Sequence, residues 1–464
     1  MASNPFNFDT TKGPLFGRIM IFVLPLAAIY LLERFVSCMD MAVVGRYAGG
    51  VSSLAAIVTS EEIYSLIRIP ITGIACGALV TVAQYRGAGD DRGLSRAIHT
   101  SLVLALVFGL VLMSAGLILA RPLLMSIKVP DDLIDRSTLY LRLLLLAFPF
   151  TAVATVCCML MYGLGDTLWP LFVLLISGMV GMALNFVFVA VLRMDVAGVA
   201  LATLISQMLA APLLLLILFV FKGPERILWS KIRIHAREFG MNAAVGVPVM
   251  FYPMAFASSN IVIAARINTL GSCVIAGNAA AAQVESLGYG LFVSGMGLAA
   301  MVSAGQNFGA ERYERVRKST LVCMLTVTVA LAVSVSIGLI FGEQLVGTIS
   351  SDREVVEQAM KRLYLTLPAY LLLGLSEVAT RALIGLGRWW AAVAYGVKIL
   401  GGCVVSVIWV EATFKLSEFH SLRDMLIYRP VSAGIVYVVN GAIFFLVIGA
   451  LIRKRRRAGS EESL

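Results

Sequence analysis

Long apolar runs separated by short polar breaks fill almost the whole chain. A helix needs about 20 mainly apolar residues to cross the hydrocarbon core of a bilayer, and each of these runs is long enough. The pattern predicts twelve spans, near residues 17–44, 53–84, 97–120, 138–162, 168–192, 196–221, 242–267, 273–306, 319–342, 362–386, 389–410 and 430–452. Several runs exceed the bilayer thickness, so we expect tilted or bent helices. The sequence therefore predicts an all-α integral membrane protein.

The distribution of Lys and Arg predicts the orientation of these spans. An even number of spans places both ends on one side, and the loops of that side hold more Lys and Arg than the opposite loops, including the segment 312–318 and the run Arg453–Arg457. Basic residues are enriched in cytoplasmic loops, so both termini are expected in the cytoplasm. The run Arg453–Arg457 is interpreted as a stop-transfer anchor, with an acidic lipid or a partner as the alternative.

Composition excludes several classes of protein. The chain is 59% hydrophobic and 14% charged, which leaves no room for a sizeable soluble domain. The formal net charge of +10 follows from basic residues beside spans, so nucleic-acid binding is not expected. The cysteines lie in or beside apolar runs without CxxC spacing, and no HExxH or GxxxxGK[ST] motif occurs, so we expect no metal site, disulfide framework, cofactor or ATP-binding loop. The segment Met1–Leu15 does not have the pattern of a cleavable signal peptide.

An internal repeat relates the two halves of the chain through one constant offset, the separation between Gly73 and Gly295. Residues Gly73, Ala78, Val80, Gln84, Gly87 and Ala88 recur as Gly295, Ala300, Val302, Gln306, Gly309 and Ala310. The same offset relates Gly163-Leu164-Gly165 to Gly385-Leu386-Gly387. We therefore predict an N-terminal lobe over 1–221, a cytoplasmic linker over 222–240 and a C-terminal lobe with a basic tail over 241–464, each lobe a six-helix bundle. A pseudo-two-fold axis along the membrane normal is expected to relate the bundles, which suits rocking about a central cavity.

Ionisable residues within the predicted spans are the main candidates for function. Charges inside a membrane are costly, so they tend to pair, to face a cavity or to act in transport. The spans contain Glu33, Arg34, Asp40, Glu61, Glu62, Arg68, Glu285, Glu377, Arg381 and Lys398. A carboxylate that moves between water and a dry cavity binds a proton, or a hard cation where other oxygens surround it. Prolines at the start of each half, Pro25 and Pro248, are candidate hinges.

Spacing along each helix suggests how these groups are used. Glu33 and Asp40 are two helical turns apart and share one face, and Glu377 and Arg381 are at positions i and i+4 and can pair. The Glu377–Arg381 pair is either structural or part of a substrate cavity. That cavity is also expected to include Glu33, Gln283, Glu285 and Lys398. Glu285 and Lys398 have no partner at helical spacing. For Glu61, Glu62 and Arg68 two interpretations remain: they line a cavity for a polar or zwitterionic solute, or they form a buried network with Arg34.

Four segments resemble the multidrug and toxic compound extrusion (MATE) transporters, whose superfamily also contains flippases of lipid-linked polysaccharides. They are Met39-Asp40-Met41-Ala42-Val43-Val44-Gly45-Arg46, Tyr162-Gly163-Leu164-Gly165-Asp166-Thr167, Val196-Ala197-Gly198-Val199-Ala200-Leu201-Ala202-Thr203 and Val302-Ser303-Ala304-Gly305-Gln306-Asn307-Phe308-Gly309-Ala310. The similarity runs through nearly the whole chain in the same order.

The resemblance implies a cation or proton site at Asp40, Asn185 and Thr203. In better-known members an Asp follows the Asn by one turn, but here that position is Val189. The missing charge favours protons over Na⁺ as the coupling ion, with Na⁺ at Asp40 as the alternative. Acidic residues of the second lobe also act in family members, which makes Glu285 and Glu377 candidates for a second coupling or substrate site.

The sequence thus predicts a secondary antiporter that exports a small organic solute, cationic or zwitterionic, in exchange for protons or Na⁺. It is expected to be a multidrug efflux protein of a bacterial inner membrane, surrounded by lipid and monomeric, and not an enzyme. A flippase of lipid-linked saccharide is the alternative within the superfamily. An intramembrane enzyme that uses Glu61 and Glu62, or a receptor or scaffold that transports nothing, is the alternative from another class. The solute, the coupling ion and the oligomeric state are not fixed by the sequence.

Overall fold

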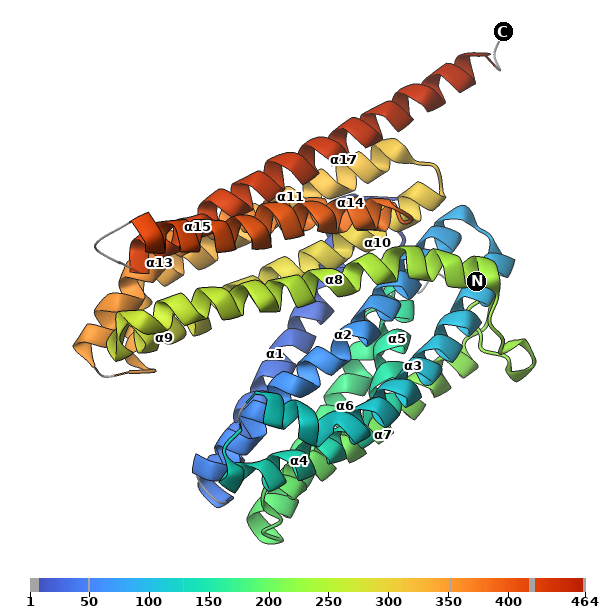
Figure 1. The fold of residues 1–464 in the computed structure, drawn as a ribbon. Helices are drawn as coiled ribbons and strands as arrows, with labels where there is room; N and C mark the ends of the chain where they lie inside the picture. The colour runs from blue at the N-terminus through green and yellow to red at the C-terminus, as the bar shows by residue number, and fades with distance from the viewer. Residues whose placement is uncertain (1–7, 49–50, 128, 351, 417–421, 462–464) are drawn as a thin grey trace. The chain divides into compact units, whose positions relative to one another are not determined.

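All regular structure in the described part of the chain is helical. The structure is a computed structural model that describes residues 8–48, 51–127, 129–350, 352–416 and 422–461. Within these ranges there is no strand, and Figure 1 shows long helices joined by short connections. The ends of the two predicted lobes, 1–7 and 462–464, lie outside the described residues. The prediction of an all-α protein is confirmed.

The helices form two compact units. Unit 1 contains Phe8 and residues 24–250, and unit 2 contains residues 9–23 and the described residues from Phe251 onward. The helices of unit 1 are α2 (Val51–Ala88), α3 (Asp91–Ser126), α4 (Asp131–Leu146), α5 (Phe148–Leu164), α6 (Leu168–Phe186) with the π-helical η1 (Val187–Val191), α7 (Asp195–Val220) and the 3₁₀ turn η2 (Trp229–Lys231).

Unit 2 contains a matching set of helices. They are η3 (Asn268–Leu270), α9 (Ser272–Gly288), η4 (Tyr289–Ser294), α10 (Gly295–Gly309), α11 (Tyr313–Ile340), α12 (Gly342–Gly347), α13 (Arg353–Gly385), α14 (Trp390–Val397), η5 (Lys398–Val404), α15 (Val405–Leu416), α16 (Leu422–Leu426) and α17 (Tyr428–Glu461). Helices α1 (Leu15–Tyr47) and α8 (Ala236–Ile267) each contribute one part to unit 1 and the other part to unit 2.

Eleven helical segments of the described residues are long and apolar enough to cross a membrane, and a bent pair would make a twelfth. That pair is α4 and α5, which meet at an angle of 49° where the sequence predicts one span over 138–162. The break falls at Ala147, just before Pro149. Proline has no N–H to donate and its ring clashes with the preceding turn, so the chain starts a new helix there. The pattern of spans is otherwise as predicted.

Side-chain caps and left-handed residues end the helices in both units. Asp90 accepts a hydrogen bond from the Gly93 N–H at the start of α3 (2.8 Å), and Asp352 accepts one from the Glu354 N–H at the start of α13 (2.9 Å). Such a cap supplies an acceptor to N–H groups that have no partner in the first turn. The chain turns with positive φ after α5 at Gly165 (92°) and shortly after α13 at Gly387 (74°), and the repeat offset relates these two positions.

The repeat is also visible in how helices approach each other inside each unit. A Cβ atom at Gly163 of α5 would lie 2.8 Å from the carbonyl oxygen of Leu79 in α2. At the equivalent position in unit 2, a Cβ atom at Gly385 of α13 would lie 2.4 Å from the carbonyl oxygen of Met301 in α10. Leu79 and Met301 are themselves related by the repeat offset. Both units therefore use glycine to bring the same two helices into backbone contact.

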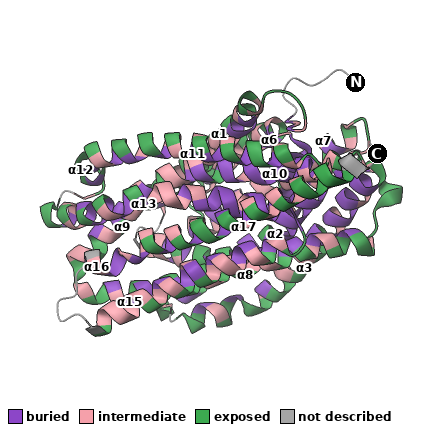
Figure 2. Cartoon of the chain, turned by 90° about the horizontal axis from the view of Figure 1, so that it is seen from above, coloured by how far each residue is buried: buried purple, intermediate pink, exposed green. Residues whose placement is uncertain are grey.

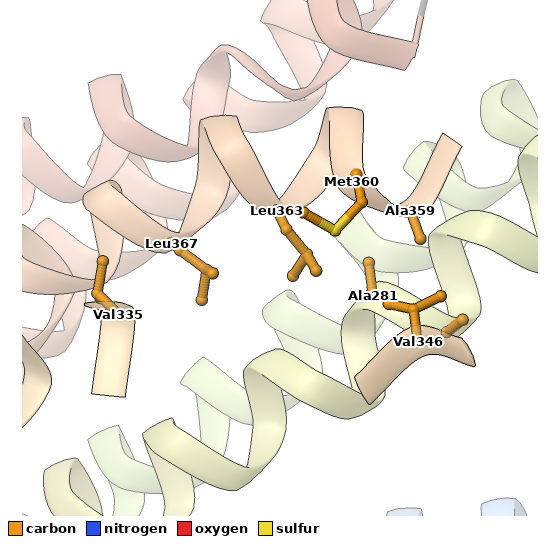
Figure 3. Packing of buried hydrophobic residues seen from close by; sticks show 8 residues of the cluster. Ala281, Val335, Val346, Ala359, Met360, Leu363 and Leu367 are labelled. Atoms are coloured by element: carbon orange, nitrogen blue, oxygen red, sulfur yellow. The ribbon is translucent and has the colours of Figure 1, made fainter. Parts of the chain in front are cut away.

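An apolar cluster fills part of the interior of unit 2 where α13 meets α9, α11 and α12. Figure 3 shows Leu363 and Leu367 of α13 packed with Ala281 of α9, Val335 of α11 and Val346 of α12. All of these side chains are buried. Close packing of this kind is the main attraction between helices that share a lipid surrounding, since lipid tails are as apolar as Leu.

Large apolar side chains also cover the outside of many helices. Ile118 of α3 is 75% exposed, Leu325 of α11 is 68% exposed and Leu446 of α17 is 68% exposed. Figure 2 shows exposed residues along helices such as α3 and α11. Apolar surface of this extent is unfavourable in water but suits contact with lipid, so the exposed faces are as expected for a membrane protein.

The glycine contacts give a direct test of this packing. Gly163→Ala in unit 1 and Gly385→Ala in unit 2 are each expected to destabilise the protein by about 1–3 kcal/mol, because the added methyl meets backbone atoms that cannot rotate away. The matched controls are Gly240→Ala in unit 1 and Gly449→Ala in unit 2, where a Cβ atom meets nothing within 4 Å. Thermal unfolding of the detergent-purified chain measures the effect. Equal melting temperatures for variants and controls would contradict the packing described here.

Candidate functional site

Asp40 and Asn185 form the centre of a polar site inside unit 1. Asp40 lies near the end of α1, and Asn185 lies in the last turn of α6. The Asn185 Nδ2 atom donates a hydrogen bond to Asp40 Oδ1 at 2.5 Å. Asn185 is 1% exposed, whereas Asp40 is half-buried. The carboxylate is thus hydrogen-bonded on one side to a buried amide and remains partly accessible on the other.

The surroundings of this pair hold a further polar atom without a partner. The Oδ1 atom of Asn185 is buried and has no hydrogen bond among the described residues. Val189, which stands one turn after Asn185 in the π-helical segment η1, is fully buried and has no charged side chain. The hydroxyl of Thr203 in α7 makes no hydrogen bond to Asp40 or Asn185 within the described part of the chain. The structure therefore brings together two of the three residues that the sequence assigned to an ion site.

The other charged candidates that the sequence proposed in α1 and α2, namely Glu33, Arg34, Glu61, Glu62 and Arg68, are exposed. Glu61 accepts a hydrogen bond from the Tyr140 hydroxyl of α4 (2.9 Å). Glu33, Glu62 and Arg68 are exposed, and the structure shows no ion pair between them among the described residues. Arg34, which the sequence suggested as a member of a buried network, instead donates to the Tyr30 hydroxyl (3.0 Å). The structure does not form the buried network, so these charges remain available to solvent or to a solute.

Glu285 of α9 has the opposite environment in unit 2. It is 2% exposed and accepts hydrogen bonds from Arg362 of α13 at 2.8 and 2.6 Å. Arg429 of α17 also donates to it (2.9 Å), as do the hydroxyls of Thr366 (2.5 Å) and Tyr370 (3.1 Å). The sequence offered no partner for Glu285 at helical spacing, and the structure supplies its partners from α13 and α17. Its partners lie far along the chain, where helical spacing carries no information.

Glu377 of α13 also sits between two cations. Arg381 donates to Glu377 Oε1 at 2.7 Å, which is the pair expected from spacing, and Lys398 of η5 donates to Oε2 at 2.6 Å. The Lys398 Nζ atom lies 4.2 Å from the ring centroid of Tyr252, close enough for a cation–π contact. Lys398 has no partner at helical spacing, as the sequence indicated, and its partner Glu377 lies on a different helix, α13.

Gln283 does not join Glu285. It is exposed and lies just before the buried Glu285 on α9, at a spacing that points the two side chains to different faces of the helix. The candidate hinges lie at distinct places: Pro25 is buried inside α1, and Pro248 is half-buried inside α8. Each proline lies close to the point where its helix passes from one unit to the other, after Val23 in α1 and after Met250 in α8.

Two motif segments have local structural roles. In unit 2, Gln306 Oε1 accepts hydrogen bonds from the backbone and side chain of Thr10 (3.2 and 3.1 Å), and Asn307 donates to the Thr10 hydroxyl (2.9 Å). In unit 1, Asp166 accepts from the N–H groups of Leu168 and Trp169 at the start of α6. Burial raises the pKa of Asp166, and these two hydrogen bonds partly offset the shift. The motifs therefore fix chain segments and do not line the Asp40 site.

The two units stabilise the negative charge of their carboxylates in different ways. Glu285 and Glu377 each contact two fixed cations, so protonating either one would leave buried positive charge uncompensated. Asp40 and Glu61 instead contact a neutral amide and a neutral phenol. A group that changes its charge during a cycle suits the second environment, because its neutral form leaves no charged partner behind.

Breaking the Glu285 cluster tests its structural role. Arg362→Met removes the bidentate partner and is expected to destabilise the protein by about 3–5 kcal/mol, as for other buried pairs that lose one member. The matched control is the preceding residue, Lys361→Met, whose partner Glu357 is exposed; loss of a surface pair of this kind is expected to change stability little. Chemical denaturation in a lipid–detergent mixture measures the free energy of unfolding of both variants. A similar loss in the two variants would show that the cluster does not hold unit 2 together.

Comparison with known proteins assigns the chain to a family. The MatE family model matches residues 25–187 and 248–408, one segment in each half of the chain. The chain is 24% identical over 427 residues to the probable multidrug resistance protein YoeA of Bacillus subtilis, covering 89% of each protein. It is 28% identical over 348 residues to the multidrug resistance protein PmpM of Pseudomonas aeruginosa, covering 73% of this chain and 72% of PmpM.

Solved structures agree on the fold. A crystal structure of MATE in the bent conformation superimposes with a TM-score of 0.88 at 18% identity, covering 95% of this chain and 97% of that one. The outward-facing conformation of a multidrug resistance MATE family transporter gives a TM-score of 0.89 at 19% identity, with 96% and 98% covered. Because the family model covers more than half of the sequence and the fold agrees over nearly all of it, the chain belongs to the MatE family, the multidrug and toxic compound extrusion transporters.

Proposed function

We propose that this transporter is an antiporter that exports a small organic solute, cationic or zwitterionic, in exchange for protons. The relatives named above are multidrug resistance proteins, which supports efflux of organic compounds and favours neither a flippase of lipid-linked saccharide nor an enzyme. The observation that carries the proposal is the Asp40–Asn185 pair, in which the carboxylate of α1 is bonded to a neutral amide. Protonation of Asp40 is the charge change that would bias the cycle.

The composition of this site supports a proton over Na⁺. Among the described residues, no group of three or more His, Cys, Asp or Glu side chains could hold a metal ion. Asn185 carries a buried amide oxygen, Oδ1, that has no hydrogen-bond partner among the described residues, and Val189 contributes no side-chain oxygen. Hard cations prefer about six or more oxygen ligands. A proton needs a single acceptor, and rotation of the Asn185 amide would present Oδ1 to a protonated Asp40 and Nδ2 to an ionised one.

The exposed charges of α1 and α2 support a charged solute. Glu33, Glu61 and Glu62 offer negative charge, and Arg68 offers one positive charge on the same helix as the last two. Charged groups exposed within an apolar span are unfavourable against lipid, so we propose that they face an aqueous path. A site with fixed charges binds a matching ion and rejects neutral analogues, since its own groups would otherwise lose their partners.

Proton coupling is tested with Asp40→Asn in proteoliposomes. An imposed pH gradient is expected to drive efflux of a fluorescent organic cation such as ethidium by the native chain. In the Asp40→Asn variant, the rate of this gradient-driven efflux is expected to fall by about tenfold or more, which is within the usual range of coupling between sites. Asp135→Asn is the control, because Asp135 is 79% exposed and forms a surface pair with Arg121. Undiminished efflux in the Asp40 variant would remove this residue from the mechanism. Efflux driven by a Na⁺ gradient alone would show that Na⁺, and not the proton, is the coupling ion.

Solute selectivity is tested with the double variant Glu61→Gln and Glu62→Gln. Loss of two negative charges is expected to weaken binding of an organic cation by about tenfold or more, which corresponds to about 1.4 kcal/mol, and to leave a neutral analogue of similar size unaffected. Quenching of intrinsic tryptophan fluorescence measures both affinities in detergent. An equal change for the charged and the neutral compound would count against charge recognition by α2.

A further inference from the structure

A cavity of about 510 Å³ in unit 1 has a strongly basic lining that the transport site does not use. It is formed by the start of α3 and by the segment between α7 and α8. Its charged residues are Arg92, Arg96, Arg226, Lys231 and Arg233, against the single carboxylate of Asp91. His99 and His235 also contribute to the wall. Such a concentration of positive charge in one cavity attracts an anion.

Most of this positive charge is not compensated by the protein. Arg96 pairs with the buried Glu238 (3.1 Å). Arg92, Arg226, Lys231 and Arg233 have no ion pair with a carboxylate among the described residues. The nearby Glu225 forms no ion pair with these residues among the described residues, and counting it with Asp91 and Glu238 still leaves fewer carboxylates than the five basic residues. The cavity therefore keeps a net positive charge.

A cavity in unit 2 shows that clustered arginines are not always free in this protein. It has a volume of about 350 Å³ and includes Arg455 and Arg456, but here Arg456 pairs with Glu314 (2.6 Å) and Arg455 lies 3.9 Å from Glu311. Arg312 and Arg315 also belong to this wall, so it holds four arginines against the two carboxylates of Glu311 and Glu314. The wall of the unit 1 cavity holds five basic residues against one carboxylate and therefore carries the larger excess of positive charge.

Hydrogen bonds fix the walls of the unit 1 cavity. The buried His99 ring accepts a hydrogen bond from the Leu228 N–H at Nε2 (3.0 Å), and its Nδ1 atom lies 2.6 Å from the Ser95 carbonyl oxygen, to which it can donate. The His235 N–H donates to the Thr100 hydroxyl (3.2 Å), and Arg233 Nε donates to the His235 ring (3.2 Å). Both histidines thus attach the segment to α3. The basic side chains are presented by a wall that is already in place.

The same segment carries exposed apolar side chains beside its charges. Trp229 is 78% exposed and stacks on Phe219 of α7, with ring centroids 5.1 Å apart. Ile232 is 39% exposed and Ile234 is 51% exposed, and they alternate with Lys231 and Arg233. Tryptophan, and apolar side chains that lie beside basic ones, favour the boundary between lipid and water. Because α7, α8 and α3 are all candidate spans, their adjoining ends place the segment at that boundary.

We propose that this basic cavity binds the phosphate group of an anionic phospholipid, while Trp229, Ile232 and Ile234 contact the adjoining acyl region. The charge selects a phosphate, and the exposed apolar residues select a lipid over a free anion. Basic pockets between membrane helices bind lipid headgroups by the same combination of charge and position. Bound lipid would hold the segment between α7 and α8 at the membrane surface.

The experiment is native mass spectrometry of the full-length chain in detergent, titrated with dioleoyl phosphatidylglycerol or dioleoyl phosphatidylcholine. The native chain is expected to prefer the anionic lipid. In the triple variant Arg92→Gln, Arg226→Gln, Lys231→Gln, the ratio of the affinity for phosphatidylglycerol to that for phosphatidylcholine is expected to fall by about tenfold or more. The reason is that each basic residue near a membrane surface contributes measurably to the binding of anionic lipid. The control is the triple variant Arg121→Gln, Arg353→Gln, Lys361→Gln, which removes the same charge from exposed positions elsewhere. It is expected to keep the preference.

Three outcomes would overturn the proposal. An equal loss in the control would show that net charge alone, and not the cavity, determines lipid binding. Displacement of phosphatidylglycerol by inorganic phosphate at equal concentration would show a site for a free anion in place of a lipid. No preference for phosphatidylglycerol in the native chain would remove the site altogether. Thermal unfolding without added lipid checks that the variants are folded, and Lys231→Glu, a single reversal of charge at an exposed position, repeats the test if the triple variant is not.

Discussion

The placement of charge inside apolar helices is the constraint on which this structure depends. A buried carboxylate loses its hydration, and the protein must supply either an opposite charge or neutral hydrogen-bond donors in return. In unit 2, Glu285 and Glu377 each form ion pairs with two basic side chains. These ion pairs connect α9 to α13 and α17, and they connect α13 to η5. In unit 1, Asp40 and Glu61 receive an amide and a phenol. The difference separates charges that hold the protein together from charges that can change.

The two halves of the chain therefore share a framework but not a chemistry. Gly163 and Gly385 bring equivalent helices into backbone contact, and Gly165 and Gly387 turn the chain after equivalent helices. Backbone contacts of this kind tolerate few substitutions, which explains why the repeat is readable at glycine positions. The carboxylates do not follow the repeat: the counterpart of Glu61 at the repeat offset is Gln283, and the counterpart of Asp40 is Val262. Duplication of a bundle thus leaves each copy free to carry its own polar groups.

Surface charge has a separate organisation from charge within the spans. The segment between α7 and α8 combines uncompensated basic residues with exposed Trp229 and Ile234. The Leu228 N–H donates to His99 of α3, and the His235 N–H donates to Thr100 of α3, so both hydrogen bonds hold the segment against α3. Arg455 and Arg456 of α17 instead pair with Glu311 and Glu314. A count of arginines along the sequence does not distinguish these cases, because the distinction lies in which carboxylates reach them.

The sequence by itself determined the class of the protein, the number and approximate position of its spans, the internal repeat and the family. These follow from local patterns, since the length of an apolar run, the spacing of glycines and short motifs do not require knowledge of distant contacts. It also found the Glu377–Arg381 pair, which depends only on helical periodicity. The tertiary structure alone decided that Arg362 and Arg429 neutralise Glu285, that Lys398 neutralises Glu377, and that Asn185 but not Thr203 bonds to Asp40 within the described residues. These partners lie on different helices, and their meeting depends on how the helices pack, which no local pattern encodes.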